Sequence, residues 1–154
     1  MKYYIYPWRY FYRHKVRMIE KQIREQRFNS ILDFGSGPGL MRNEWEKHAK
    51  EVILFDKESE NDVYFPPVSI AICASIMEFV NLKYTFEKLA NSTKEIIVAS
   101  PMQNRLSKLY FKLIGDKNMR HSNQEIMDEM IKHFYIKHYE SWMGLYFCAY
   151  GVKR

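Results

Sequence analysis

Three glycines at alternate positions follow a short apolar run that contains a single acid. The segment reads Ile31-Leu32-Asp33-Phe34-Gly35-Ser36-Gly37-Pro38-Gly39. Glycines at this spacing allow a sharp turn and leave no Cβ between the main chain and a ligand. A strand, such a turn and then a helix form a ligand site at the carboxyl edge of a parallel sheet. We call Gly35–Gly39 the glycine turn.

The residues around the glycine turn narrow the choice of ligand. A nicotinamide-type fingerprint needs a glycine at the sixth position counted from Gly35, where this chain has Leu40. A Walker loop is excluded, since no Gly-Lys-Ser/Thr follows. The acid at position 33, two residues before the first glycine, suits a cationic ligand better than a pyrophosphate.

The elements that must position this turn alternate between helices and strands. Strands are expected at 30–34, 52–55, 68–74, 95–100, 135–142 and 145–152. Apolar spacing predicts helices over 8–27, over a segment after the glycine turn that carries Met41, Trp45 and Ala49, and over 84–90, 106–113 (ended by Gly115) and 122–134. The 68–74 strand is apolar on both faces, which favours a central place in a parallel sheet.

Ser122 and Glu125 have the form of a capping box at the start of the last helix. A hairpin follows it, with Gly144 between the two strands. Alternating strands and helices that end in an antiparallel hairpin predict a three-layer α/β/α sandwich with a mostly parallel sheet. We expect one domain over 1–154, with an N-terminal helical segment (1–29) and a ligand-binding core (30–154).

The glycine turn resembles the first motif of the Rossmann-like (class I) S-adenosylmethionine-dependent methyltransferases, in particular small, type 11-like ones. Their motif is acidic-x-Gly-x-Gly-x-Gly, and Asp33–Gly39 matches it throughout. The resemblance implies S-adenosylmethionine as cofactor and methyl transfer to a small-molecule or macromolecular acceptor that the sequence does not name. It assigns no catalytic residue, and no His/Cys spacing indicates a metal site.

The resemblance also implies cofactor-binding residues downstream. The family has an acid at the end of the second strand that holds the ribose hydroxyls, and Asp56 matches it, seventeen residues after Gly39. The implied cofactor-binding residues are Asp33, Gly35, Ser36, Gly37, Gly39, Asp56, Lys57, Asp62, Ala74 and Ser75. Only eleven residues separate Asp56 from Val68, too few for the helix and third strand of the family. The sheet is therefore expected to be trimmed at that edge, or to have only one short strand there, near Asp62 and Val63.

The positive charge lies at the N-terminus. The chain has 24 Lys and Arg against 18 Asp and Glu, and residues 1–30 hold eight basic against two acidic residues, so this segment accounts for the whole excess. Such a surplus favours anionic partners, and Arg9, Arg13 and Arg17 could contact RNA or another anion. The aromatic residues within 1–12 could instead form a lid over a sulfonium cofactor.

Composition excludes several other classes. At 47% apolar and 27% charged residues, the chain is neither disordered nor of low complexity. No apolar run is long enough to span a bilayer, and no secretory signal is recognisable. Two cysteines cannot form a disulfide framework, which favours the cytoplasm. Two alternatives to a methyltransferase stay open: a protein that binds the cofactor without turnover, and a nucleic-acid-binding module that uses the N-terminal helix.

Overall fold

A six-stranded sheet organises the computed structural model, which describes residues 8–56, 64–105, 107–109 and 121–154. The strands are β1 (Phe28–Phe34), β2 (Ala49–Phe55), β3 (Val68–Ala74), β4 (Thr93–Pro101), β5 (Phe134–Trp142) and β6 (Tyr146–Lys153). They lie in the order β2-β1-β3-β4-β6-β5, and β1 to β4 are mutually parallel. β6 runs antiparallel to β4, and β5 antiparallel to β6.

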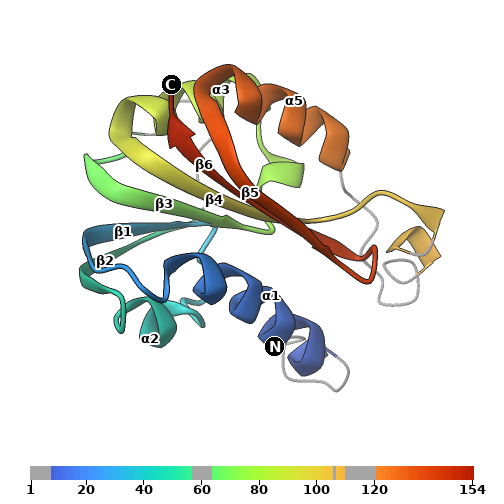
Figure 1. Cartoon of the computed structure of the whole chain (residues 1–154), viewed down its shortest axis with the longest axis horizontal. Helices are drawn as coiled ribbons and strands as arrows, with labels where there is room; N and C mark the ends of the chain where they lie inside the picture. The colour runs from blue at the N-terminus through green and yellow to red at the C-terminus, as the bar shows by residue number, and fades with distance from the viewer. Residues whose placement is uncertain (1–7, 57–63, 106, 110–120) are drawn as a thin grey trace.

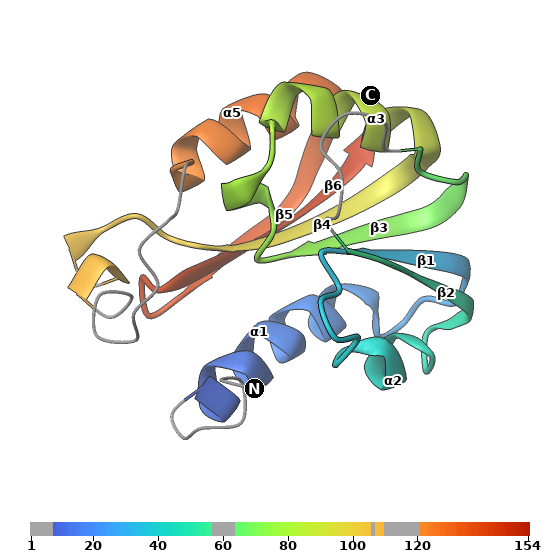
Figure 2. The same ribbon diagram turned by 180° about the vertical axis from the view of Figure 1, so that it is seen from behind.

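Helices cover both faces of this sheet (Figures 1 and 2). α1 (Trp8–Ile23) and the short α2 (Arg42–Trp45) lie on one face, and α3 (Leu82–Ser92) and α5 (Asn123–His133) on the other. A single 3₁₀ turn, η2 (Met77–Phe79), joins β3 to α3. The predicted three-layer α/β/α arrangement, with its parallel sheet and antiparallel C-terminal hairpin, is confirmed.

Alternation along the strands produces two apolar cores. On β1, Leu32 and Phe34 face α3 and α5, whereas Ile31 packs with α1 and α2. Because side chains alternate along a strand, Asp33 lies on the same face as Ile31, beneath α1 and α2. The fold thus directs the acid of the glycine motif toward the N-terminal helix.

The structure corrects the predicted helix after the glycine turn. Helical spacing suggested one helix carrying Met41, Trp45 and Ala49, but α2 ends at Trp45 and Ala49 opens β2. The His48 N–H donates to the Trp45 carbonyl. The His48 carbonyl accepts from the N–H of Phe28, the first residue of β1, so hydrogen bonding to the sheet begins at His48. Pairing with β1 therefore ends the helix at Trp45, one turn before Ala49, although the apolar spacing favoured a helix that included Ala49.

The other helices begin close to where the sequence places them. Ser122 and Glu125 form the predicted capping box of α5, with reciprocal side-chain to backbone hydrogen bonds. α1 ends at Ile23 rather than Arg27. Of the predicted 106–113 helix and Gly115, only 107–109 are described, and those three are helical; the remainder lies outside the described residues.

Within the described residues, β2 is the edge strand on one side of the sheet. Between Phe55 and Val68, the described residues 56 and 64–67 form neither helix nor strand. Within the part of the chain that the structure describes, β2 pairs only with β1. Residues 57–63, where a further strand would lie, are outside the described residues, so the trimming after the second strand stays a prediction.

The hairpin between β5 and β6 turns at two residues with positive φ, Met143 (φ 49°) and Gly144 (φ 65°), and the Leu145 N–H donates to the Trp142 carbonyl at 2.9 Å. Two positive φ values define a type I′ turn, which favours Asn-Gly. Met143 is 67% exposed and so has little packing to lose. We expect Met143→Asn to raise the free energy of unfolding by about 0.5–1 kcal/mol by relieving left-handed strain. Denaturant unfolding would measure this change, and Met143→Ala, which keeps the strain, should give no gain.

Candidate functional site

Three neighbouring strands bring the sequence-predicted residues to one edge of the sheet. β1 lies between β2 and β3, and all three run in the same direction. The glycine turn follows the carboxyl end of β1, Asp56 follows β2, and Ser75 follows β3. Asp56 is exposed at the end of β2, whereas Ala74 is buried at the end of β3. Lys57 and Asp62 lie outside the described residues.

The glycine turn is fastened to the end of β2. The N–H groups of Gly35 and Ser36 both donate to the Phe55 carbonyl, at 2.7 and 3.3 Å. The Gly39 N–H then donates to the Ser36 carbonyl at 2.9 Å, which closes the turn. Phe55 directly precedes Asp56, so these bonds fix the turn beside that carboxylate.

Gly35 and Gly37 require glycine for different reasons. Both have positive φ, at 80° and 50°. A Cβ on Gly35 would lie 2.5 Å from the Cβ of Ile76, so the turn packs directly on the segment after β3. A Cβ on Gly37 would meet no atom within 4 Å. Gly35 therefore serves packing, whereas Gly37 leaves its main chain open to approach.

Asp33 is a fully buried carboxyl with one oxygen engaged. The Trp45 Nε1–H donates to Oδ2 at 3.1 Å, while Oδ1 is buried and has no hydrogen-bond partner among the described residues. Burial raises the pKa of Asp33 to about 6, against the opposing effects of the Trp45 hydrogen bond and the charge of Lys15. Such an oxygen is costly unless a donor reaches it.

Lys15 brings a positive charge from α1 to the same edge. Its Nζ donates to the Ser75 Oγ at 3.0 Å. Burial lowers the pKa of Lys15, and the negative charges of Glu78 and Asp33 oppose that shift. Ser75 has φ 59°, an uncommon value for a residue other than glycine, and its N–H donates to the Ala99 carbonyl at 2.7 Å. Strained backbone of this kind concentrates at functional sites.

Glu78 is the second buried acid near Lys15. It is 2% exposed, and its Oε2 accepts a hydrogen bond of 2.7 Å from the Ser100 Oγ. The carboxyl edge of β1, β3 and β4 therefore holds two buried acids and one half-buried lysine. Charged groups are rarely placed together inside a protein unless they are paired or bind something.

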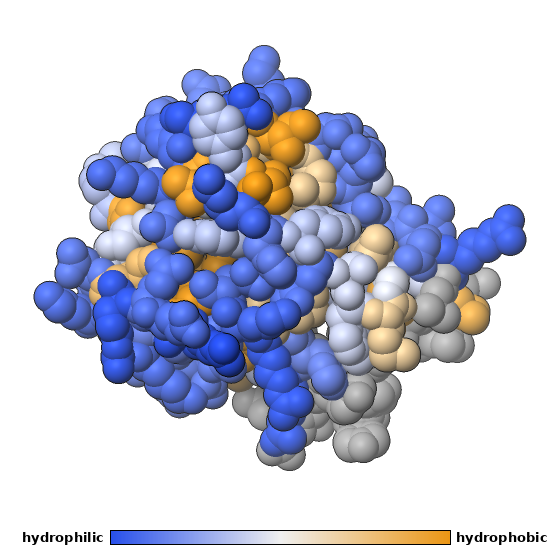
Figure 3. Space-filling view, in the orientation of Figure 1, coloured by the Kyte–Doolittle hydropathy of each residue, from blue (hydrophilic) through white to orange (hydrophobic). Residues whose placement is uncertain are grey.

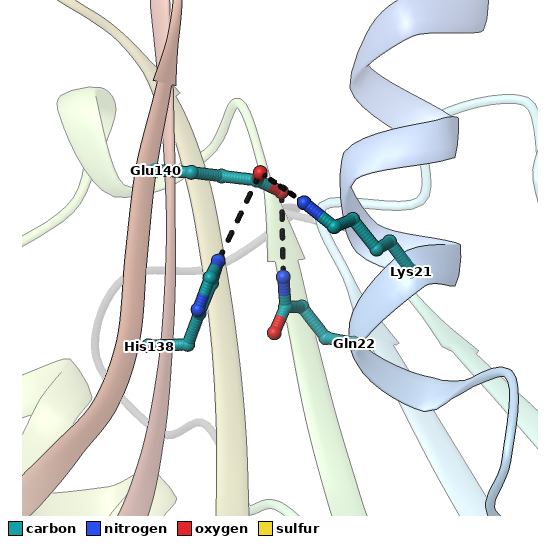
Figure 4. Close-up of polar contacts among 4 residues, drawn as sticks. All are labelled: Lys21, Gln22, His138 and Glu140. Carbon is teal, nitrogen blue, oxygen red and sulfur yellow. Dashed lines mark hydrogen bonds and ion pairs between the residues drawn. The ribbon is translucent and has the colours of Figure 1, made fainter.

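Contacts with β5 and the end of the hairpin fix the position of α1 on the sheet (Figure 4). Lys21 pairs with Glu140 at 2.9 Å, and the Gln22 amide donates to the same carboxylate at 3.3 Å. His138 approaches Glu140 from the same strand, with 3.8 Å between Nε2 and Oε2. About two helical turns from Lys21 toward the N-terminus, the rings of His14 and Trp142 stack with centroids 4.5 Å apart. These contacts on both sides of Lys15 hold it at the site.

The arginines expected to bind anions lie away from this cluster. Arg13 and Arg17 are exposed, and the side chain of Arg9 lies outside the described residues. At 100° per residue, Arg13 and Arg17 project from the side of α1 opposite Lys15. Hydrophilic side chains cover much of the face of the molecule that Figure 3 shows. An RNA or anion contact by these arginines stays a prediction.

The sequence interpretation missed Lys15 and Trp45. Trp45 was assigned to the apolar stripe, yet its indole N–H bonds Asp33. Lys15 was counted only in the net charge, although it lies three residues after Tyr12 and four before Ile19, on the apolar face of α1. A lysine at that spacing was the available signal. His121, just before α5, has its Nε2 2.9 Å from the Val80 carbonyl oxygen.

The described residues contain neither a cluster of metal ligands nor a helix that could span a membrane. Within 8–56, 64–105, 107–109 and 121–154, no three His, Cys, Asp or Glu side chains gather as metal ligands would. None of the helices in these ranges combines the length and apolar character needed to cross a bilayer.

Comparison with known proteins identifies the fold. No protein-family model matches the sequence, and no curated protein matches it. Solved structures do match. The N-methyltransferase NodS from Bradyrhizobium japonicum WM9, in complex with S-adenosyl-L-homocysteine, is 6% identical with a TM-score of 0.68, over 92% of this chain and 86% of that chain.

Two further structures give the same result. A SAM-dependent methyltransferase from Aquifex aeolicus is 14% identical with a TM-score of 0.67, over 90% of this chain and 89% of that chain. Magnesium protoporphyrin IX methyltransferase (ChlM) from Synechocystis PCC 6803 with bound SAH is 11% identical with a TM-score of 0.61, over 92% and 84%. Identities this low establish the fold alone. The chain has the Rossmann-like fold of the class I S-adenosylmethionine-dependent methyltransferases.

Proposed function

We propose that this chain is an S-adenosylmethionine-dependent methyltransferase whose acceptor is unidentified. The observation that carries the proposal is the glycine turn, fastened beside Asp56 and open at Gly37. This edge of the sheet is where ligands bind in folds of this kind. The structural neighbours named above include two that hold the demethylated cofactor.

The residues present fit this cofactor. Main chain at Gly37 has room for close approach by a ligand. The Asp56 carboxylate, exposed at the end of β2, can accept hydrogen bonds from both ribose hydroxyls. The Oδ1 of Asp33 can accept from the ammonium group of the methionine end. Lys57 and Asp62, which lie outside the described residues, stay predicted cofactor-binding residues from the family resemblance.

The cofactor supplies a methyl group that its sulfonium already activates for displacement. The residues of the chain then bind and align: the glycine turn and Asp56 fix the nucleoside, while Asp33 and Ser75 flank the amino-acid end. Alignment and exclusion of water account for much of catalysis in a reaction of this type. A general base is needed only where the acceptor must lose a proton.

A reducing compartment suits the cysteines. Cys73 and Cys148 are both free and buried. Burial raises the pKa of the Cys73 thiol well above its ordinary value and that of Cys148 to about 12, so both are unreactive as thiolates. We propose a cytoplasmic location on this basis.

Calorimetric titration of the full chain with S-adenosylhomocysteine tests the proposal. We expect binding, and Asp56→Ala should weaken it about 10- to 100-fold because charge-assisted hydrogen bonds to the ribose are lost. Asp128→Asn, on the exposed side of α5, is the matched control and should bind as the unaltered chain does. No heat from correctly folded protein would overturn the proposal. Binding without release of S-adenosylhomocysteine from the methyl donor in cell extract would favour the non-catalytic alternative.

A further inference from the structure

Lys15 is an unusual residue for its position on α1. It lies on the face of the helix that packs on the sheet, near the buried side chains of Val16 and Ile19. Withdrawal of an ammonium group from water is costly, and a methionine would fill the same space without that cost. Lys21, on the same helix, pairs instead with Glu140 at the surface. Fold stability therefore does not explain a lysine at position 15.

The surroundings of Lys15 define what it could bind. An ammonium has three donor hydrogens, and the Ser75 Oγ accepts one. The negative charges that act on it are those of Asp33, from β1, and Glu78, from η2. Glu78 is already bonded by Ser100, and Asp33 by Trp45 through one oxygen. Among the described residues, one acid oxygen therefore lacks a donor, and the nearby Lys15 uses one of its three donor hydrogens.

A free α-amino acid group satisfies both needs at once. Its ammonium can donate to the buried Oδ1 of Asp33, and its carboxylate can accept from Lys15. We propose that Lys15 is a binding residue for the α-carboxylate of the amino-acid end of the ligand, with Asp33 receiving the α-ammonium. This inference rests on the proposed function, and it makes α1 part of the ligand site. Lys15 then determines selectivity for nucleosides that carry an amino-acid end.

Two nucleoside ligands separate this role from a general one. S-adenosylhomocysteine has the amino-acid end, and 5′-deoxy-5′-methylthioadenosine has the same nucleoside without it. We expect Lys15→Met to weaken the homocysteine ligand at least tenfold and to change methylthioadenosine affinity less than twofold. Lys15→Arg should restore part of the lost affinity, because it keeps the charge. Arg17→Met, on the opposite side of α1, is the matched control and should bind both ligands as the unaltered chain does.

The outcomes distinguish the two proposals. Equal losses for both ligands in Lys15→Met would show that Lys15 only shapes the site, and unchanged homocysteine affinity would show that it does not contact the ligand; either overturns this inference alone. If the unaltered chain binds neither ligand, the proposed function fails and this inference fails with it. Thermal unfolding checks each variant, and Lys15→Gln replaces Lys15→Met if the latter does not fold.

Discussion

Replacing Gly35 with alanine should lower the free energy of unfolding by about 2–4 kcal/mol, whereas the same change at Gly37 should lower it by only about 1 kcal/mol. Both positions have positive φ, so both variants incur left-handed strain. Only at Gly35 does the new methyl group collide with the main body of the protein, 2.5 Å from the Cβ of Ile76. The difference between the variants therefore isolates the packing of the turn on the segment after β3.

Ligand affinity should be sensitive to Gly37, the position where the expected loss of stability is the smaller of the two. The added methyl at Gly37 meets no protein atom, so it would project into the space that the ligand is proposed to fill. We expect Gly37→Ala to weaken S-adenosylhomocysteine binding at least tenfold in a chain that is still folded. Denaturant unfolding and calorimetry on the same preparations measure both quantities. Full affinity in Gly37→Ala would place the ligand elsewhere, and equal stability losses would contradict the packing argument.

Local patterns predicted the elements that build the site. The apolar run of β3, the capping box of α5 and the strand before the glycine turn each depend on residues a few positions apart. Their order along the chain was enough to place the glycine turn, Asp56 and Ser75 at one edge, because parallel strands end together. These are the parts of the fold that short-range physics specifies.

Contacts between distant segments could not be predicted in this way. The hydrogen bond from Lys15 to Ser75 joins residues 60 positions apart, and the bond from Trp45 to Asp33 depends on how α2 meets the sheet. The short length of α2 has the same origin, since strand pairing at His48 stops the helix. Helical spacing marks Lys15 as facing the core, but only the packed structure shows which acids lie there.

The predicted trimming of the sheet after the second strand would leave the candidate site intact. The glycine turn, Asp56 and Ser75 follow β1, β2 and β3, which are neighbours in the sheet. A further strand would lie outside β2, beyond these three. Trimming would therefore remove a flank of the site rather than its centre.

The pH dependence of stability should reveal Asp33. Its carboxyl loses a proton near 3.8 when exposed to water but at about 6 in the folded chain, since burial disfavours the charge. Between these values the folded state binds more protons than the unfolded state, so raising the pH lowers the free energy of unfolding. This contribution is fully present below about pH 4 and is lost as the pH rises through 6. Its full size is about 3 kcal/mol.

Asp33→Asn isolates this effect from the other acids. Glu44, Glu125 and Glu129 have lowered pKa values and act in the opposite direction, but they are the same in both chains. The stability of the unaltered chain relative to Asp33→Asn should fall by up to about 3 kcal/mol between pH 4 and 8. Urea unfolding across this range measures the difference, and a difference that does not vary with pH would show that Asp33 titrates normally.

Ligand binding should show the reverse dependence. An ammonium group that donates a hydrogen bond to the Asp33 Oδ1 favours the charged form of that carboxyl. S-adenosylhomocysteine should therefore bind more tightly as Asp33 ionises. Below pH 6 its affinity should fall by up to about tenfold per pH unit, and Asp33→Asn should bind weakly without this slope. Burial lowers the pKa of Lys15, the cation whose charge acts on Asp33, and the negative charges of Glu78 and Asp33 oppose that shift. A slope that persists in Asp33→Asn would assign the proton to another group and remove Asp33 from the ligand site.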